Sequence, residues 1–292
     1  MEPEYDPKLL RCTLCGSTDI EDYDRDYRGH GISRCRSCDV RFMNPQYSDA
    51  YLAEFYSQYI SFHGEPKRRR DKVELRVAGK SRGLGFLRDS LGMGGEKPRV
   101  LMVGCGDGLE LQLAKEQGFQ PEGYDVDPEI TAECSRRHEV PVHHGTFQNI
   151  PVEPGSLDAI WMDQVLEHPK NPSDYLRHCH LLLREGGALY LGLPHIASFS
   201  NKFKTWLDRV GLKRKRRGAH YATRHHLTFF GAKGLRELLE GRYDFDVVLQ
   251  RGSPKPSRSP ASNLLGAKFP WMDSGFLTIA TKRRQEAARR AG

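Results

Sequence analysis

The most regular feature of the chain is an alternation, from Pro98 onward, of short apolar runs with segments of helical periodicity. Alternation of this kind is typical of a parallel sheet whose strands are joined by helices. We expect seven strands at Val100–Val103, Gly123–Val126, Val140–His143, Ala159–Met162, Ala188–Leu193, Phe245–Gln250 and Phe276–Thr281.

The segments between these runs carry helix start and stop signals. Asp127 precedes Pro128 as a predicted N-cap, and glycines follow several segments, as they commonly do after a helix. We expect helices at Leu109–Gln117, Pro128–His138, Pro172–Arg184 (capped by Asn171 and ended by Gly186 and Gly187) and Ala232–Glu240 (ended by Gly241).

Composition narrows the class of protein. Hydrophobic residues make up 38% of the 292 residues and charged residues 28%, which excludes global disorder. No apolar run approaches the roughly 20 residues of a membrane helix, and the start of the chain lacks a signal-peptide pattern. We therefore expect a cytoplasmic protein with no transmembrane segment. Its formal charge is +7, and a zinc ion held by four thiolates would lower this to about +5.

Four of the seven cysteines form two matched pairs. Cys12 and Cys15 are separated by two residues, as are Cys35 and Cys38, and nineteen residues lie between the pairs. This spacing predicts a four-thiolate zinc ribbon over residues 1–46, with a structural ion because no coordination position stays open. Gly16 follows the first pair, where the turn needs a small residue. Four unrelated buried thiols are the alternative.

A glycine-rich turn follows the first predicted strand. Gly104, Gly106 and Gly108 open the next helix, and Asp125 comes seventeen residues after Gly108, at the end of the second strand. Such a turn lets a ligand lie against the backbone, and a carboxylate in this place can accept hydrogen bonds from ribose hydroxyls. Leu109 stands where a dinucleotide fingerprint has its third glycine, so a nucleoside without phosphates fits better. A turn that serves packing alone is the alternative.

Four stretches together resemble the class I S-adenosylmethionine-dependent methyltransferases: 100–108, 123–128, 157–168 and 183–191. The resemblance covers about 185 residues, Arg99 to Arg283. It implies an α/β fold with a seven-stranded Rossmann-like sheet, mostly parallel with the last strand antiparallel, and S-adenosylmethionine as cofactor. The front of the chain resembles a branch in which a zinc ribbon precedes this domain, because Phe42-Met-Asn-Pro45 and a Tyr-rich helix follow the second cysteine pair. The implied domains are the ribbon (1–46), a helical lid or linker (47–95), the methyltransferase domain (96–284) and a basic tail (285–292).

The resemblance also implies roles for individual residues. Gly104, Cys105, Gly106 and Gly108 would line the methionine and ribose portion of the cofactor, and Asp125 with Val126 would meet the ribose. Phe147 and Gln148 would flank the adenine, and Asp163 and Gln164 would lie beside the sulfonium. Most relatives carry an acidic residue where this chain has Met102, so one contact that supports the cofactor is absent or comes from elsewhere.

Three of the twelve histidines stand where a base for the acceptor would be needed. His168 follows Glu167 just after the fourth strand, and His225 and His226 precede the helix at Ala232. A neutral imidazole suits proton removal because its unperturbed pKa is close to working pH. We rank His226 first and His225 second. A loop-orienting role for His168, and a short strand with inward aromatics for residues 225–230, are the alternatives.

Aromatic and basic segments bear on the acceptor. The aromatic positions Tyr51, Phe55, Tyr56, Tyr59 and Phe62 predict a helix that packs on the core or closes as a lid, with Tyr56 or Tyr59 near the sulfonium. The basic runs Lys67–Lys72 and Lys213–Arg217 suit a phosphate-bearing small acceptor, or RNA, or serve solubility alone. Residues 163–168 resemble small-molecule and sugar enzymes, which favours O-methylation of a sugar, glycan or secondary metabolite. An RNA methyltransferase and a non-catalytic cofactor-binding scaffold are the alternatives.

Overall fold

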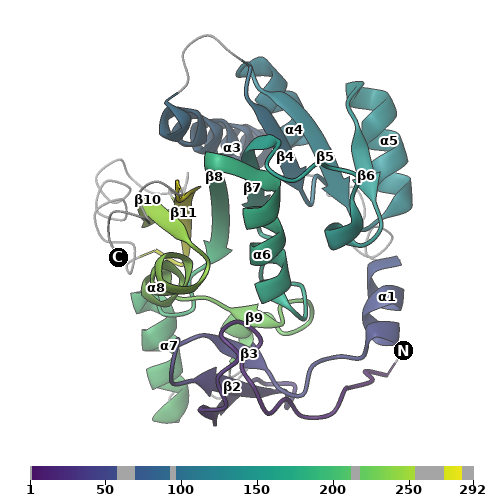
Figure 1. The fold of residues 1–292 in the computed structure, drawn as a ribbon. Coiled ribbons are helices and arrows are strands. Elements are labelled where there is room, and N and C mark those ends of the chain that lie inside the picture. Colours follow the sequence, from purple (N-terminus) through teal and green to yellow (C-terminus); the bar gives the residue numbers. More distant parts are fainter. Residues whose placement is uncertain (1, 58–69, 93–96, 212–217, 254–272, 285–292) are drawn as a thin grey trace. The chain divides into compact units, whose positions relative to one another are not determined.

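The computed structural model describes residues 2–57, 70–92, 97–211, 218–253 and 273–284 (Figure 1). Its residues group into two compact units. The first comprises residues 1–51, 164–176 and 191–278, and the second comprises residues 52–163, 177–190 and 279–292.

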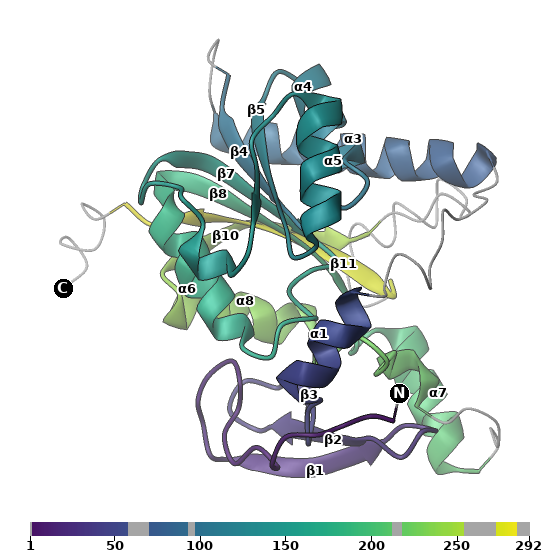
Figure 2. The ribbon, with the colours of Figure 1, turned by 90° about the vertical axis from the view of Figure 1, so that its right-hand side faces the viewer.

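A four-stranded antiparallel sheet belongs to the first unit (Figure 2). Its order is β1-β2-β3-β9, and its strands are β1 (Ile20–Arg25), β2 (Gly31–Cys35), β3 (Arg41–Met43) and β9 (Thr228–Phe229). The last strand comes from a distant part of the sequence, since Phe42 pairs with Thr228. Both residues of β9 are buried, which agrees with a short strand in residues 225–230. Phe229 and Tyr221 pack there with Ile32 in one cluster.

The second sheet has the seven predicted strands in the order β10-β11-β8-β7-β4-β5-β6. Strands β4, β5, β6 and β7 run parallel, with Val103 opposite Tyr124 and Met162 in the two neighbouring strands, whereas the C-terminal strands are antiparallel. The strands are β4 (Arg99–Val103), β5 (Gln120–Asp125), β6 (Val142–His144), β7 (Leu157–Asp163), β8 (Leu183–Pro194), β10 (Phe245–Gly252) and β11 (Gly275–Lys282). The predicted α/β sheet is confirmed.

The helices are α1 (Asp49–Ser57), α3 (Arg70–Leu91), α4 (Leu109–Glu116), α5 (Pro128–His138), α6 (Pro172–Leu182), α7 (Phe199–Arg209) and α8 (Ala232–Arg242), with short 3-10 turns at Phe147–Asn149 and Ala219–Tyr221. Asp127 caps α5 as predicted, since its side chain accepts from the N–H groups of Glu129 and Ile130. Helix α7 was not predicted.

Two predicted helix ends were wrong. Helix α6 stops at Leu182 and β8 begins at the next residue, so Gly186 and Gly187 lie inside the strand. A Cβ at Gly187 would come within 2.9 Å of the carbonyl oxygen of Arg184, so this glycine permits a close backbone approach and does not end a helix. Helix α8 continues through Gly241 to Arg242.

The interior of the second unit is built around a stacked ring pair. Trp161 on β7 and Tyr190 on β8 lie with ring centroids 3.7 Å apart and planes 8° from parallel. Gly83 on α3 faces this pair, because a Cβ there would lie 2.7 Å from the Trp161 ring. The absence of a side chain lets α3 approach the sheet closely, and α3 and α4 lie side by side (Figures 1 and 2).

Several predictions fall outside the described residues: Tyr59, Phe62, the side chains of 67–72, the run 213–217 and the tail 285–292. Within the described ranges, none of the helices has the length and apolar character needed to cross a membrane.

Candidate cofactor site, histidine cluster and metal centre

The turn after β4 is built from three glycines with positive φ. Gly104, Gly106 and Gly108 have φ values of 72°, 50° and 77°, in the left-handed region that favours glycine. A Cβ at Gly108 would lie 2.2 Å from a ring nitrogen of His138. Gly106 differs, because beyond its two chain neighbours the nearest described atom to such a Cβ is an oxygen 4.0 Å away. One side of the turn is therefore open, as a ligand lying on bare backbone requires.

Asp125, at the end of β5, is fixed by this turn. One carboxylate oxygen accepts from the N–H of Gly106 at 3.0 Å, and the other accepts from the N–H of Asp127 at 3.2 Å. Burial raises the pKa of Asp125 above its ordinary value, although both N–H groups oppose the shift. Each carboxylate oxygen has two acceptor positions, so the carboxylate can still accept from two ribose hydroxyls. Val126, the next residue, is exposed.

Two cations on α3 bind the acidic groups near the turn, and the sequence analysis missed them. The ammonium of Lys80 lies 2.5 Å from Asp163, at the end of β7, and 2.7 Å from Glu110, in the first turn of α4. Burial lowers the pKa of Lys80, but the two carboxylates outweigh this effect and raise it overall. Arg76, one helical turn earlier, binds Asp107. Their spacing of four residues places Arg76 and Lys80 on one face of a helix, but it does not indicate which carboxylates they bind.

Phe147 and Gln148, expected to flank the adenine, differ in exposure. The Phe147 ring is 1% exposed and packs between Tyr124 and His178, with centroid separations of 5.1 and 5.0 Å. Stacking on adenine would require this ring to become accessible. Gln148 is half-buried and keeps a side chain that can reach a ligand. Met102 is buried in β4.

The three predicted base candidates lie together in the first unit. The ring centroids of His225 and His226 are 4.4 Å apart. The centroid of the His168 ring lies 5.5 Å from that of His225 and 5.0 Å from that of His226. His168 donates from Nδ1 to the carbonyl oxygen of His225 at 2.9 Å. The backbone also joins these segments, because the N–H groups of Leu227 and Thr228 both donate to the carbonyl oxygen of Glu167.

The charge state of His226 follows from its surroundings. Burial, with His168 and His225 nearby, lowers the pKa of His226 to about 3, so the imidazole is neutral at working pH. Its Nε2 lies 3.9 Å from a carboxylate oxygen of Glu167, whose side chain is 1% exposed. An imidazolium formed during a reaction would be stabilised by an ionised Glu167. The ligand atoms of Glu167, His168 and His226 lie within 4.8 Å of one another, a spacing that could also hold a metal ion.

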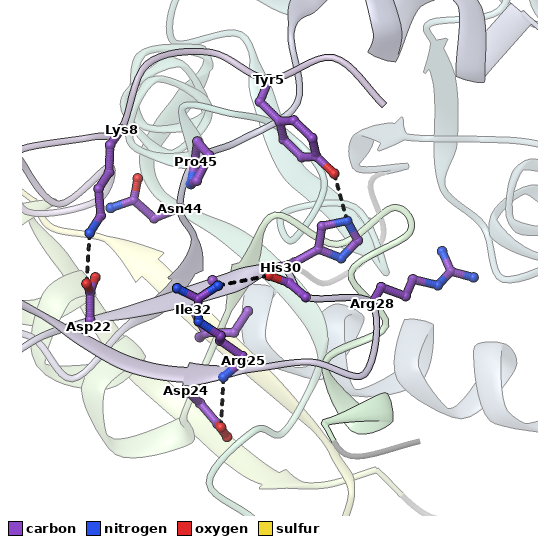
Figure 3. A pocket seen from close by; sticks show the side chains of 12 residues that line it. Tyr5, Lys8, Asp22, Asp24, Arg25, Arg28, His30, Ile32, Asn44 and Pro45 are labelled. Atoms are coloured by element: carbon purple, nitrogen blue, oxygen red, sulfur yellow. Dashed lines mark hydrogen bonds and ion pairs between the residues drawn. The ribbon is translucent and has the colours of Figure 1, made fainter. Parts of the chain in front are cut away.

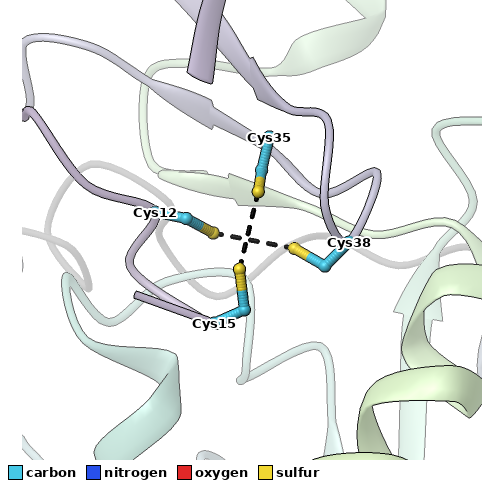
Figure 4. Close-up of side chains that lie close together, drawn as sticks. All are labelled: Cys12, Cys15, Cys35 and Cys38. Atoms are coloured by element: carbon cyan, nitrogen blue, oxygen red, sulfur yellow. Dashed lines mark hydrogen bonds between the residues drawn. The ribbon is translucent and has the colours of Figure 1, made fainter. Parts of the chain in front are cut away.

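The four predicted zinc ligands converge in the first unit (Figure 4). The Sγ atoms of Cys12 and Cys38 are 3.7 Å apart, and those of Cys15 and Cys35 are 3.5 Å apart. Four sulfurs at about 2.3 Å from one zinc ion would be about 3.8 Å from each other, so the cluster has nearly the dimensions of a loaded site. A thiol of Cys38 that donates to Cys12 lowers the pKa of Cys12 to about 5.

The two cysteine turns have the same backbone form. Gly16 donates its N–H to the carbonyl of Cys12 and has a φ of 74°. Asp39 does the same toward Cys35, with a φ of 57°. The positive φ explains why a glycine stands at position 16. In the second turn this position is taken by Asp39, and Asp is one of the residues that tolerate this conformation. The local geometry fits a zinc ribbon, with each turn aiming two sulfurs at one point.

A polar cavity of about 380 Å³ lies along β1 and β2 (Figure 3). His30 lines it, with its Nε2 3.1 Å from the hydroxyl of Tyr5 and 3.2 Å from that of Tyr47. Its Nδ1 is 3.1 Å from the carboxylate of Asp26 and from the hydroxyl of Thr223. Both ring nitrogens are therefore engaged, and this histidine ties the N-terminal segment and residue 223 to the small sheet.

Comparison with known proteins assigns the family. The model of the family Methyltransf_23, described as a methyltransferase domain, matches residues 50–250, more than half of the chain. The chain belongs to the class I S-adenosylmethionine-dependent methyltransferases. The glycine turn and Asp125 form part of this matched domain, and the cysteine cluster precedes it.

Curated relatives match parts of this methyltransferase. A probable S-adenosylmethionine-dependent methyltransferase of Mycolicibacterium smegmatis is 28% identical over 158 residues, 51% of this chain and 61% of the relative. The ubiquinone biosynthesis O-methyltransferase of Xanthomonas campestris pv. campestris (strain B100) is 35% identical over 100 residues, 32% of this chain and 41% of the relative. The matches thus span less than two thirds of these relatives' lengths.

Solved structures share the fold at low identity. The 1,6-didemethyltoxoflavin-N1-methyltransferase of Burkholderia thailandensis superposes with a TM-score of 0.55 at 17% identity, covering 90% of this chain and 100% of that one. The magnesium protoporphyrin IX methyltransferase of Synechocystis PCC 6803 gives 0.53 at 12% identity, covering 80% and 100%.

Proposed function

We propose that this protein transfers the methyl group of S-adenosylmethionine to a hydroxyl of a small acceptor, such as a sugar, glycan or secondary metabolite. The observation that carries the cofactor part is the carboxylate of Asp125, held by the Gly106 N–H beside an open glycine turn. When bound, the cofactor supplies an electrophilic methyl on a sulfonium. The protein has to orient the acceptor, exclude water and accept a proton.

Different residues of this chain would bind different parts of the cofactor. Gly104, Cys105 and Gly106 would present backbone to its methionine and ribose portion, and Asp125 would accept from the ribose hydroxyls. Lys80 keeps Asp163 in place at the end of β7, with Gln164 following. The N–H of Gln164 donates to the carbonyl of Gly192 on β8, which fixes the start of the loop that leads to His168.

The proton of the acceptor hydroxyl would pass to Nε2 of His226. Transfer of the methyl group to the acceptor oxygen would break its bond to the cofactor sulfur, which would keep the electron pair. His226 is neutral at working pH, but a pKa of about 3 makes it a weak base, so proton transfer would depend on an ionised Glu167 to stabilise the resulting imidazolium. His168 and His225 would hold this ring in place through the ring contacts of the cluster.

The relatives support a small acceptor. The structural neighbours are a 1,6-didemethyltoxoflavin-N1-methyltransferase and a magnesium protoporphyrin IX methyltransferase, and the Xanthomonas relative is an O-methyltransferase of ubiquinone biosynthesis. These names support the size class and do not identify the acceptor.

Incubation of the zinc-loaded protein with methyl-labelled S-adenosylmethionine and fractionated cell extract tests the proposal. We expect label in a small-molecule fraction that releases it under conditions that cleave methyl ethers. Label in RNA would instead establish the alternative substrate class. Cofactor binding with no transfer to any fraction would establish the scaffold.

A further inference from the structure

Helix α7 has its polar and apolar faces reversed relative to an ordinary surface helix. Its buried residues are polar: Asn201 is 7% exposed and Thr205 is 8% exposed. Asn201 donates to the carbonyl of His195, and the Thr205 hydroxyl donates to the carbonyl of Asn201. A helix on the surface of a globular protein normally turns its apolar stripe toward the core. The first of these bonds ties the start of α7 to the segment before it, and the second lies within the helix; the Thr205 hydroxyl also lies 3.4 Å from Nε2 of His220.

The outward face of α7 is aromatic. The side chains of Phe199, Phe203 and Trp206 on α7 are 62%, 50% and 53% exposed, and that of Val210, directly after the helix ends at Arg209, is 49% exposed. Their spacing of four, three and four residues places them on one line about 16 Å long. The rings of Phe199 and Phe203 lie 7° from parallel, and those of Phe203 and Trp206 lie 23° from parallel. We name these four residues the aromatic stripe.

The chain's net charge is concentrated in the same stretch. Residues 199–217 contain eight of the 45 Lys and Arg residues but only one of the 38 Asp and Glu residues. The remainder of the chain contains 37 of each, so this stretch of nineteen residues carries the entire formal charge of +7. Lys202 and Lys204 are exposed on α7 itself. Residues 213–217 lie outside the described residues, so only their sequence contributes to this charge.

We propose that the aromatic stripe docks α7 on the surface of an anionic lipid bilayer. Phe and Trp on one face of a helix with Lys on its flanks are the features of helices that lie in the membrane interface. Basic residues near an anionic leaflet add electrostatic attraction. The surface therefore combines apolar insertion with electrostatic attraction, and the helix is oriented with its apolar line outward before it binds.

Single-stranded RNA, the competing partner, fits this face less well. Bases stack on separate aromatic faces, whereas the Phe203 ring contacts a ring on either side of it, 6.4 and 5.8 Å away. The stripe also continues into Val210, an aliphatic side chain on which a base gains no aromatic stacking. A continuous apolar line favours acyl chains.

Sedimentation with vesicles tests the proposal on the full-length zinc-loaded protein. We expect binding to vesicles of phosphatidylcholine with about 30% phosphatidylglycerol that is at least tenfold tighter than binding to phosphatidylcholine alone. The double variant Phe203→Ser, Trp206→Ser should lose at least tenfold of this binding. Because the stripe lies outside the cofactor site, binding of S-adenosylmethionine by this variant should stay unchanged, which also shows that it is folded.

Further variants separate the apolar contribution to vesicle binding from the electrostatic one. Leu181→Ser removes a side chain that is 50% exposed on α6 and should bind vesicles like the wild type. Lys202→Gln, Lys204→Gln should weaken binding about tenfold at low salt and less at high salt. The emission of Trp206 should shift to shorter wavelength with vesicles, a shift absent from Trp206→Phe. Equal sedimentation of the double variant, or tight binding to single-stranded RNA without vesicle binding, would overturn the proposal.

Discussion

The backbone N–H of Gly106 donates to the carboxylate of Asp125 at 3.0 Å, so the glycine turn after β4 and the end of β5 form one rigid element. The N–H of Asp127 binds the other oxygen of the same carboxylate. Both hydrogen bonds have an ionised acceptor and are among the stronger ones in a protein. A ligand that meets Asp125 therefore meets a carboxylate already fixed in orientation.

Asp125→Asn should weaken binding of S-adenosylmethionine by about 10- to 100-fold, because the amide cannot accept on both sides and a hydrogen bond to a charged group is worth about 1.5–3 kcal/mol. Calorimetric titration measures this change. Glu133→Gln on the exposed face of α5 is the matched control and should bind like the wild type. Equal affinity of the two variants would remove Asp125 from the cofactor site.

Lys80 should matter for stability as well as for the site. Lys80→Met leaves Asp163 without the ammonium that it binds and Glu110 with only Arg76, 3.7 Å away, and we expect a loss of about 3 kcal/mol in the free energy of unfolding. Denaturant titration checks this value. Arg76→Gln is a useful comparison, since its short ion pair is with Asp107, which is largely exposed, and its distance to Glu110 is longer, 3.7 Å. The loss in this variant should stay below about 1 kcal/mol.

The double variant Lys80→Met, Glu110→Gln tests whether the loss of stability in Lys80→Met comes from the missing charge. It should recover part of the stability lost in Lys80→Met, because one of the two carboxylates that lost the ammonium has been neutralised. No recovery would mean that the loss comes from packing of the Lys80 side chain and not from its charge.

The central sheet and the cysteine cluster could be predicted because their signals are local. Strands such as Val100–Val103 are apolar runs next to turn residues, and matched cysteine pairs define a zinc site by spacing alone. Helix α5 was predicted to the residue because Asp127 and Pro128 mark its start. Its predicted end at His138 also agrees with the structure.

Features that depend on distant contacts were not predictable. A short strand in residues 225–230 was one of the alternatives, but its pairing with β3, far away in the sequence, could not be predicted. Lys80 lies 83 residues before Asp163, and no pattern in one sequence joins them. Helix α7 was missed although Phe199, Phe203 and Trp206 have the spacing of an amphipathic helix. That spacing does not tell which face of the helix is buried, so the exposure of the aromatic face could be seen only in the structure. The catalytic, cofactor-binding and domain assignments remain predictions.

Metal analysis should find one zinc ion per chain in protein purified without chelator. Cys35→Ser should lower the zinc content and the thermal stability together, because a structural zinc site contributes folding free energy directly. Cys179→Ser, at a buried cysteine outside the cluster, should keep the zinc ion. A second equivalent of metal that is lost in His226→Gln would instead place an ion at Glu167, His168 and His226.

His226→Gln should lower kcat about 100-fold or more while the affinity for S-adenosylmethionine stays the same. Stopped assays with the identified acceptor measure kcat, and calorimetry measures the affinity. His225→Gln should have the smaller effect of the two neighbours. His220→Gln, at a half-buried histidine outside the cluster, is the control. Unchanged turnover in His226→Gln would reject this residue as the base.

The pH dependence gives an independent test of the same residue. Burial lowers the pKa of His226 to about 3 in the folded protein, whereas an unfolded chain has the ordinary value near 6.5. The unfolded state therefore binds a proton first as the pH falls, so the contribution of neutral His226 to stability is complete above about 6.5 and is lost progressively toward pH 3. Wild-type stability should fall more steeply than that of His226→Gln between pH 6.5 and 4. A kcat profile with a limb near pH 6.5 that His226→Gln abolishes would show instead that this imidazole titrates like an exposed one.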